Sequence, residues 1–272
     1  MSTSHPPGSL LRQWRTRRRL SQLQLASRAA VSTRHLSCVE TGRSRPSREL
    51  LIHLAAELDM PGRDTNELLL AAGFAPTFSQ FALDDGPMEP VRQVIDLVLE
   101  RSDPNPTLVI DTRWNIVDAN PGALWLTSGI APELLQPPLN VARLSLHPRG
   151  LAPRIVNLGD YADHLLNQMH RTFSMTHDPE LGALLEELGN YDLPPLDERW
   201  PSTPTLVLPL HLRIYGDDLV FISTITTFGA ARDITASELS IETLYPADES
   251  TAAVLERRPW LTAPASSAPR TM

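Results

Sequence analysis

The sequence predicts two domains of different fold class: an all-α domain of five helices at the N-terminus, then an α+β domain with an antiparallel sheet. Apolar residues follow helical spacing through about residue 76, and the first strand-like segments come later. The charge divides at the same point: residues 1–76 hold 11 arginines and 6 acidic residues, against 13 arginines and 26 acidic residues in 77–272. A length of 272 residues is enough for two domains of ordinary size. We therefore expect the two parts to bind different partners.

Composition places the domains and the compartment. We expect the first domain at 8–76, a linker at 77–87, the second domain at 88–258 and a flexible tail at 259–272. The apolar fraction of 42% and charged fraction of 21% are typical of a folded globular protein. A single cysteine, Cys38, cannot form an intrachain disulfide, and the sequence has neither an export signal nor a run of 18 apolar residues. We expect a cytoplasmic protein that does not bind a membrane.

The stretch SQLQLASRAAVSTRHLSCVETGR predicts two short helices joined by a tight turn. Ser21 and Gln24 have the spacing of a capping box, so a helix is expected over 22–29. Ser32 can cap a second helix over 33–40. Only about three residues separate the helices, so they must cross steeply. This is the helix-turn-helix pattern, in which the first helix spans the DNA backbone and the second fits the major groove.

The turn between these helices has one unusual residue. Ala26 supplies the small side chain that a close helix crossing needs, and apolar residues around it supply the inner contacts. At Ala30 the turn usually carries glycine, and a positive φ at this alanine would cost roughly 1 kcal/mol. The alternative to DNA binding is a purely structural pair of helices.

Exposed positions in and around the second helix are the candidates for DNA contacts. The candidates for base contacts are Thr33, Arg34, His35, Ser37 and Cys38. The planar guanidinium of Arg34 suits a bidentate contact to guanine, so Arg34 is the first choice for specificity. The candidates for phosphate contacts are Gln22, at a helix N-terminus, and, beyond the second helix, Thr41, Arg43 and Arg45. The four arginines within residues 15–19 would add attraction to DNA, or could equally be a solvated helix end.

Helices on both sides complete a small bundle. Apolar residues at 10–14 indicate a first amphipathic helix, residues 46–47 open a fourth, and 64–72 form a fifth. Residues 8–76 resemble the phage-repressor-like, XRE-type helix-turn-helix domain, and RHLSCVETGRSRPSREL resembles the MmyB-like subgroup of bacterial regulators. The resemblance implies double-stranded DNA as a partner, phosphate contacts at the positions named above, and a homodimer.

The second part of the chain mixes strands and helices. A helix over 88–101 could bridge the domains and transmit a signal between them. TLVIDTRWNIVDAN predicts a strand, a turn and a second strand. Further helices are expected from Pro121, near Asn140, over 153–173 and over 178–188. Three C-terminal strands are expected at 205–215, at LVFISTITTF and at ELSIETLYPA. Asp248 should cap a closing helix. This order predicts a sheet with one face buried under helices, as in PAS-like sensor modules.

Two segments of this part resemble a known regulatory domain. NPTLVIDTRWNIVDANPGA and FISTITTFGAARDITASELSIETLYPADESTAAVL resemble the PAS-like ligand-binding domain of MmyB-type regulators. The resemblance implies a one-component transcription factor whose C-terminal domain encloses a hydrophobic small molecule, with fatty acyl chains the best candidates. The candidates for the pocket lining are Trp114, Trp125, Leu208, Leu210 and Phe221. Apolar residues of this kind could instead fill a closed core.

Two other functions stay open for the second domain. It could serve only to dimerise or to bind a protein partner, without a small-molecule effector. An enzyme is disfavoured because His164 and His177 do not have a recognised metal-binding spacing, and neither a Gly-rich phosphate loop nor a nucleophile elbow occurs. We therefore expect no metal and no cofactor apart from a bound fatty acid or a similar apolar molecule.

Overall fold

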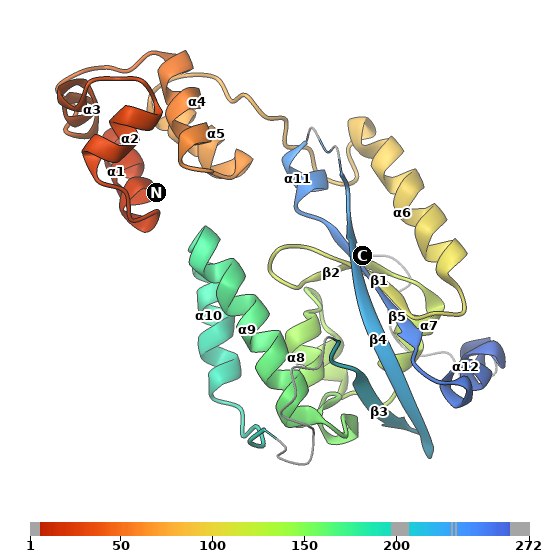
Figure 1. The fold of residues 1–272 in the computed structure, drawn as a ribbon. Helices are drawn as coiled ribbons and strands as arrows, with labels where there is room; N and C mark the ends of the chain where they lie inside the picture. The colour runs from red at the N-terminus through yellow and green to blue at the C-terminus, as the bar shows by residue number, and fades with distance from the viewer. Residues whose placement is uncertain (1–5, 197–206, 230, 232, 262–272) are drawn as a thin grey trace. The chain divides into compact units, whose positions relative to one another are not determined.

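The chain divides into two compact units (Figure 1). The computed structural model describes residues 6–196, 207–229, 231 and 233–261. The first unit takes the residues up to Ala82 together with Ala231–Thr235, and the second takes Leu83–Ala230 and the residues from Ala236 onward. The division after Ala82 lies inside the expected linker.

The first unit is all-α, as predicted. Its helices within the described residues are α1 (Pro7–Arg17), α2 (Gln22–Arg28), α3 (Thr33–Glu40), α4 (Arg48–Glu57) and α5 (Gly62–Ala71). The predicted bounds of α3 are confirmed. One apolar stripe from each helix enters a common core, whose fully enclosed side chains include Leu11, Leu25, Leu36, Leu51 and Leu68.

A short segment from far along the chain completes the first unit. The Ile234 N–H donates to the carbonyl of Ser79 at 2.9 Å, and Ile234 is itself buried. The Thr235 hydroxyl donates to the carbonyl of Phe81 at 2.7 Å, and a carboxylate oxygen of Asp233 accepts the Phe81 N–H at 3.1 Å. Because this segment belongs to the first unit, the chain passes between the two units three times.

The second unit is an α+β domain around one antiparallel sheet, which confirms the predicted class. Its strands are β1 (Thr107–Ile110), β2 (Ile116–Ala119), β3 (Leu210–Ile214), β4 (Asp217–Thr227) and β5 (Ser240–Pro246), in the spatial order β2-β1-β5-β4-β3. Its helices are α6 (Glu89–Ser102), α7 (Pro121–Leu126), α8 (Val141–Leu146), α9 (Leu158–Thr176), α10 (Pro179–Gly189) and α12 (Glu249–Glu256), while α11 (Ile234–Ser237) begins in the segment that belongs to the first unit. Short 3-10 turns lie at Gly86–Met88, Pro132–Leu135, Ala152–Arg154 and Pro259–Leu261.

Helices cover both faces of this sheet (Figure 1). On one face, Ile95 and Leu99 of α6 pack against Val109 of β1 and Ile241 of β5. On the other face, Ile110 of β1 joins a buried cluster formed with α8, α9 and α10. Successive side chains of a strand point to opposite faces, so the next residue along β5 from Ile241 points toward α9. The candidate ligand site lies on that side of the sheet.

One strand is shorter than its pattern predicts. Alternating apolar residues over 205–215 predict a strand along the whole segment, but β3 begins at Leu210. Pro209 has no N–H to give to a neighbouring strand, and its carbonyl accepts a hydrogen bond from the Asn157 side chain at 2.7 Å. Residues 205 and 206 lie outside the described part of the chain.

Two other segments also differ from the expectation. The helix expected from Pro153 begins at Leu158, because Ala152–Arg154 form a 3-10 turn and the next residue pairs with β3 in an isolated bridge. At the C-terminus, Pro259–Leu261 form a 3-10 turn inside the segment that we assigned to the tail. The remainder of that segment, 262–272, lies outside the described residues.

Candidate DNA-binding surface and ligand cavity

Caps at both N-termini fix the helix pair α2–α3. The Ser21 hydroxyl accepts the Gln24 N–H at 3.2 Å, and the Gln24 side chain accepts the Ser21 N–H at 2.8 Å, which completes the predicted capping box. Ser32 caps α3 by accepting the His35 N–H at 3.1 Å. Ala30, in the turn, has a φ of 51°, which is the left-handed conformation that glycine adopts more readily. The start and direction of α3 are therefore fixed by local hydrogen bonds.

A buried ion pair holds the inner side of α3. The Glu40 side chain is 1% exposed and accepts hydrogen bonds from Arg15 of α1, at 2.6 Å from Nε and 3.0 Å from Nη2. Gln22 of α2 donates its side-chain amide to the same carboxylate at 2.8 Å. The carboxylate thus ties three helices together. Sequence reasoning missed this role, although Glu40 follows Leu36 by four residues and so falls on the buried stripe of α3.

The outer side of α3 carries the predicted base-contact residues. Arg34 is exposed, and its guanidinium makes no hydrogen bond or ion pair with any described residue. Half-buried positions surround it: Thr33, His35, Ser37 and Cys38. The structure therefore gathers these five residues on the outer side of α3, and Arg34 is the exposed one among them.

The predicted phosphate contacts fall into two groups. Arg43 and Arg45 are exposed beyond α3, and within the described chain their guanidinium groups also lack partners. The Thr41 hydroxyl donates to the carbonyl of Ser37 at 2.7 Å, so its single hydrogen is already engaged. Gln22 is half-buried, and one hydrogen of its amide is engaged in the ion-pair cluster. The arginines are therefore the freer donors for a phosphate.

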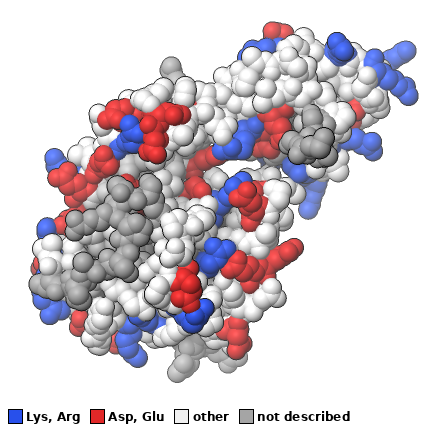
Figure 2. Space-filling view, turned by 180° about the vertical axis from the view of Figure 1, so that it is seen from behind, with Lys and Arg blue, Asp and Glu red and all other residues white. Residues whose placement is uncertain are grey.

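Some N-terminal arginines have internal partners. Arg18 donates to the carbonyls of Leu58 and Asp59 at the end of α4, at 2.7 and 2.6 Å. Arg17 and Arg18 also lie over the Trp14 ring, at 5.1 and 5.5 Å from its centroid. In the space-filling view, arginine side chains are spread over the N-terminal unit at the upper right, with few acidic side chains among them (Figure 2). Part of this group of arginines therefore stabilises the fold.

The second unit contains a cavity between the sheet and α9. A chamber of about 300 Å³, called the large chamber, adjoins a small chamber of about 80 Å³. Both chambers are lined by Val141, Tyr161, Leu210, Glu242 and Leu244. The polar side chains of the large chamber also include His164, Gln168 and Ser223, whereas the small chamber is mainly aliphatic. The volume of the large chamber is at the lower end of the roughly 300–1,000 Å³ found for small-molecule sites.

Two titratable groups lie where the chambers meet. Burial raises the pKa of Glu242, against the opposing effect of the Ser223 hydroxyl, which donates to its carboxyl group. Burial, and next the neighbouring Glu242, raise the pKa of the Tyr161 hydroxyl. Both shifts favour the protonated forms, and both groups lie in a lining that is mainly apolar.

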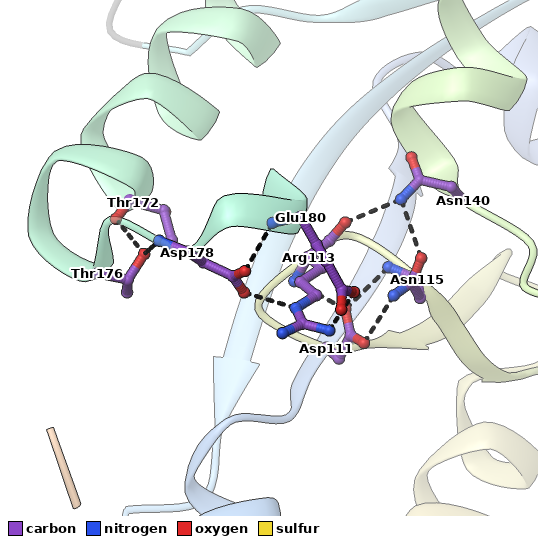
Figure 3. A network of polar contacts seen from close by, with 8 residues as sticks. All are labelled: Asp111, Arg113, Asn115, Asn140, Thr172, Thr176, Asp178 and Glu180. Carbon is purple, nitrogen blue, oxygen red and sulfur yellow. Dashed lines mark hydrogen bonds and ion pairs between the residues drawn. The ribbon is translucent and has the colours of Figure 1, made fainter. Parts of the chain in front are cut away.

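A polar network fixes the turn that places Trp114 in the wall of the large chamber (Figure 3). A carboxylate oxygen of Asp111 accepts the N–H groups of Arg113 and Asn115 at 2.7 and 2.9 Å. Trp114, between them, has a φ of 63°. The Asn115 side chain donates back to Asp111 at 2.9 Å, which closes the turn. The strained backbone at this tryptophan is therefore held by hydrogen bonds on both sides.

The same network attaches this turn to the helices over the cavity (Figure 3). The buried Asn140 donates to the carbonyl of Arg113 at 2.8 Å and caps α8 by accepting the Arg143 N–H at 3.1 Å. The Arg113 guanidinium pairs with Asp178 at 2.5 Å and with Glu180, both at the start of α10. Sheet, α8 and α10 are thus tied together beside the large chamber.

Comparison with known families assigns both units. Residues 91–257 match the family described as the MmyB-like transcription regulator ligand binding domain. The chain belongs to the MmyB-like transcription regulators. Residues 8–68 match a helix-turn-helix domain. The two resemblances found in the sequence are confirmed, and this MmyB-like protein is a DNA-binding transcriptional regulator with a ligand-binding domain.

Similarity of this MmyB-like regulator to individual proteins is low. No curated protein matches the chain. Among solved structures, one titled "Structure of an RNA-binding Light-Oxygen-Voltage Receptor" is similar at 12% identity and a TM-score of 0.30, over 94% of this chain and 64% of that one. The chain thus spans less than two thirds of that structure.

The structure separates the five predicted pocket residues of the MmyB-like domain. Trp114, Leu208 and Leu210 line the large chamber. Trp125 and Phe221 lie in a buried core cluster and line neither of the two chambers. Phe221 is fully enclosed on β4, opposite Leu210, and packs in that cluster rather than against open space. These two aromatic residues stabilise the core of the domain.

Two residues of the cavity were not found from the sequence. Tyr161 lies on α9 and lines both chambers. Glu242 lies between Ile241 and Thr243 on β5, and the alternation of the strand points it toward α9. An acidic residue at an inward position of a strand was the signal available.

The described residues contain neither a metal-binding cluster nor a membrane-spanning helix. Across the described ranges, no cluster of three or more His, Cys, Asp or Glu could hold a metal ion. His164 lines the large chamber, whereas His177 ends α9 in a left-handed conformation with a φ of 54°. No described helix is long and apolar enough to cross a membrane.

Proposed function

We propose that this MmyB-like regulator reads its operator through α3 and senses an aliphatic molecule in the cavity between the sheet and α9. Two copies bind as a symmetric dimer, with their α3 helices about one DNA turn, or roughly 34 Å, apart. Effector binding changes how the dimer presents α3 to DNA.

The free guanidinium of Arg34 is the observation that carries the DNA-reading proposal. Arg15 and Arg18 are engaged inside the unit, whereas Arg34, Arg43 and Arg45 are exposed and have no partner among the described residues. Arg34 lies on the helix that the fold presents, and the other two follow that helix. Arg34 therefore suits a base edge, and Arg43 and Arg45 suit phosphates.

Operator-binding assays test this division. The operator is first selected from random duplexes, and variants are then compared on the operator and on an unrelated duplex. Arg34→Ala should lose about 1–3 kcal/mol on the operator alone, and so flatten the sequence preference. Arg43→Ala should weaken both duplexes alike and lower the salt slope by about 1.

Arg12→Ala is the matched control, because Arg12 is exposed on α1 and outside the proposed interface. It removes the same charge and should change neither preference nor salt slope appreciably. Equal losses from Arg34→Ala and Arg43→Ala on every duplex would contradict the assignment of base and phosphate contacts.

The cavity supports the sensing part of the proposal. Its lining is mainly aliphatic, and each methylene group buried there contributes about 0.8 kcal/mol. A fatty acyl chain is therefore a suitable tail for the ligand. Native mass spectrometry and lipid extraction of the purified protein test this, and a copurifying aliphatic molecule is the expected result.

A protein-binding role is the second candidate for this unit. Val94 and Leu97 of α6 are 43% and 50% exposed, and exposed apolar side chains on one helix suit a partner surface. Protein that is repeatedly empty, and that binds no aliphatic probe, would favour this alternative over ligand sensing.

The route of coupling is the last part of the proposal. Cavity residues Ser223 and Glu242 lie on β4 and β5, and the connection between these strands contains the segment 231–235 of the first unit. We propose that this connection transmits the state of the cavity, beside the helix α6 that the sequence suggested. Asp233→Ala should abolish the effector response while operator and effector affinities persist, whereas Asp217→Ala, at the exposed β3–β4 turn, should not. A normal response in Asp233→Ala would contradict this route.

A further inference from the structure

We infer that the cavity selects an aliphatic ligand whose head group donates a hydrogen bond and carries no negative charge, and that it disfavours an ionised carboxylate. A hydroxyl group and a protonated amine share this chemistry. The inference rests on the proposed sensing function and narrows its ligand class. Glu242 is the residue that decides it.

Glu242 is placed where a carboxyl group is unfavourable without a partner. It lies in the middle of β5, opposite Leu108 of β1 and Ile225 of β4, and it lines both chambers. Taking a carboxyl group out of water costs free energy unless its oxygens are hydrogen-bonded. The Ser223 hydroxyl donates to Oε1, while Oε2 has no hydrogen-bond partner among the described residues. One oxygen is therefore left for a hydrogen-bond partner that the described protein does not supply.

Tyr161 completes the head-group site. It comes from α9, on the opposite side of the cavity from β5, and lines both chambers with Glu242. A ligand hydroxyl at this junction can donate to Glu242 and accept from the Tyr161 hydroxyl. A ligand ammonium can pair with the Glu242 carboxylate and donate to the tyrosine oxygen. In both cases the aliphatic lining is left for the tail.

The lining offers little to a carboxylate. No arginine is among the described residues that line either chamber, and the whole sequence contains no lysine. His164 is the single described lining residue whose side chain can take a positive charge, and it is exposed in the large chamber. A ligand carboxylate beside Glu242 would either place two negative charges together or force them to share a proton. A fatty acid should therefore bind more weakly than the alcohol or amine of the same chain.

Calorimetric titration of the full-length protein at pH 8 with octanol, octylamine and octanoate tests the inference. We expect octanol and octylamine to bind at least about tenfold more tightly than octanoate. Glu242→Gln keeps the shape and removes the charge. It should strengthen octanoate binding and weaken octylamine binding, each by about tenfold, and change octanol binding by less than about threefold.

Glu186→Gln is the matched control, since Glu186 is exposed on α10 and lines neither chamber. It should leave all three affinities unchanged. Retained octanol binding shows that Glu242→Gln is folded, and if it does not fold, the ranking of the three probes on the unmodified protein decides the question.

The possible outcomes separate this inference from the function on which it rests. If octanoate binds most tightly to the unmodified protein, or if Glu242→Gln shifts none of the affinities, the head-group inference is overturned and sensing survives. If none of the three probes binds, the proposed sensing function fails and the inference fails with it. The result that supports the inference is an opposite effect of Glu242→Gln on two probes, with stronger binding of octanoate and weaker binding of octylamine.

Discussion

Replacing Glu40 by glutamine should destabilise the helical unit by about 3 kcal/mol. The carboxylate is 1% exposed and accepts two hydrogen bonds from Arg15 and one from Gln22. Breaking a buried ion pair from one side costs about 3–5 kcal/mol, because the remaining charge is left without a counter-ion. We expect the lower end, because Arg15 is 12% exposed and keeps its hydrogen bond to the carbonyl of Leu20. Glutamine has nearly the same shape, so a cavity adds nothing to the loss.

Hydrogen exchange measured by mass spectrometry on the full-length protein reports this unit separately from the other. A loss of about 3 kcal/mol should speed exchange of the protected amides in α1, α2 and α3 by about a hundredfold, while peptides of the sheet stay unchanged. Glu67→Gln is the control, because Glu67 is exposed on α5. Its effect should stay within about 0.5 kcal/mol.

A double variant distinguishes a lost ion pair from a lost contact. Arg15→Met with Glu40→Leu replaces both charges by apolar side chains, and it should be more stable than Glu40→Gln alone, since no charge is left unpaired. Unchanged protection of α1–α3 in Glu40→Gln would refute the reasoning. It would mean that the buried carboxylate contributes nothing that its amide cannot supply.

Three further changes test the backbone and the electrostatics by urea titration. Ala30→Gly should stabilise the protein by about 0.5 kcal/mol, because glycine accepts a φ of 51° without strain. Ala56→Gly, on the exposed face of α4, should instead destabilise the protein by about 1 kcal/mol. If both variants lost the same stability, the backbone at Ala30 would not be strained. Gly8→Ala should destabilise by about 2 kcal/mol, since its Cβ would lie 2.4 Å from the carbonyl oxygen at the end of α3, while Gly189→Ala, with open space around it, should not. Burial and next the nearby Glu67 raise the pKa of Asp64 from 3.8 to about 6, so the folded protein binds this proton more tightly than the unfolded chain does. Asp64→Asn should therefore stabilise the folded protein by about 1 kcal/mol at pH 8, after allowance for the part of the carboxyl group that stays in water. This gain in stability should fade between pH 6 and pH 4. A gain that does not depend on pH would refute the raised pKa as its cause.

Local signals predicted most of the helical unit. The Ser32 cap indicated where α3 begins, and Ala30 lies at a turn position that usually carries glycine, where the structure has a positive φ. These features depend on a few neighbouring residues, so the sequence alone contains them. The partners of Arg15 and Arg18 lie 25 and 40 residues away, and a pattern of local spacing does not reveal such pairs.

The ligand cavity was predictable only in part, for a different reason. Alternation and helical spacing tell which side chains point inward, and Trp114, Trp125 and Phe221 do all point inward. Alternation and helical spacing do not tell whether the space between the sheet and the helices is filled, because that depends on the distance between the helices and the sheet. Trp114 lines open space since a polar network fixes its turn, whereas Trp125 and Phe221 fill the core. Inward direction is a property of the sequence, and empty volume is a property of the packing.

The two units therefore meet opposite physical demands. A unit that reads base edges must hold α3 in one register, and the capping box, the Ser32 cap and the buried ion pair at Glu40 all reduce its freedom. A unit that senses a ligand must have at least two states between which the ligand can choose, and a space of about 300 Å³ beside Glu242 leaves room for that choice. Any effect of the ligand on the operator must be matched by an equal effect of the operator on the ligand, since the coupling free energy is shared. A regulator in which ligand affinity does not depend on bound DNA would consequently hold a ligand without responding to it.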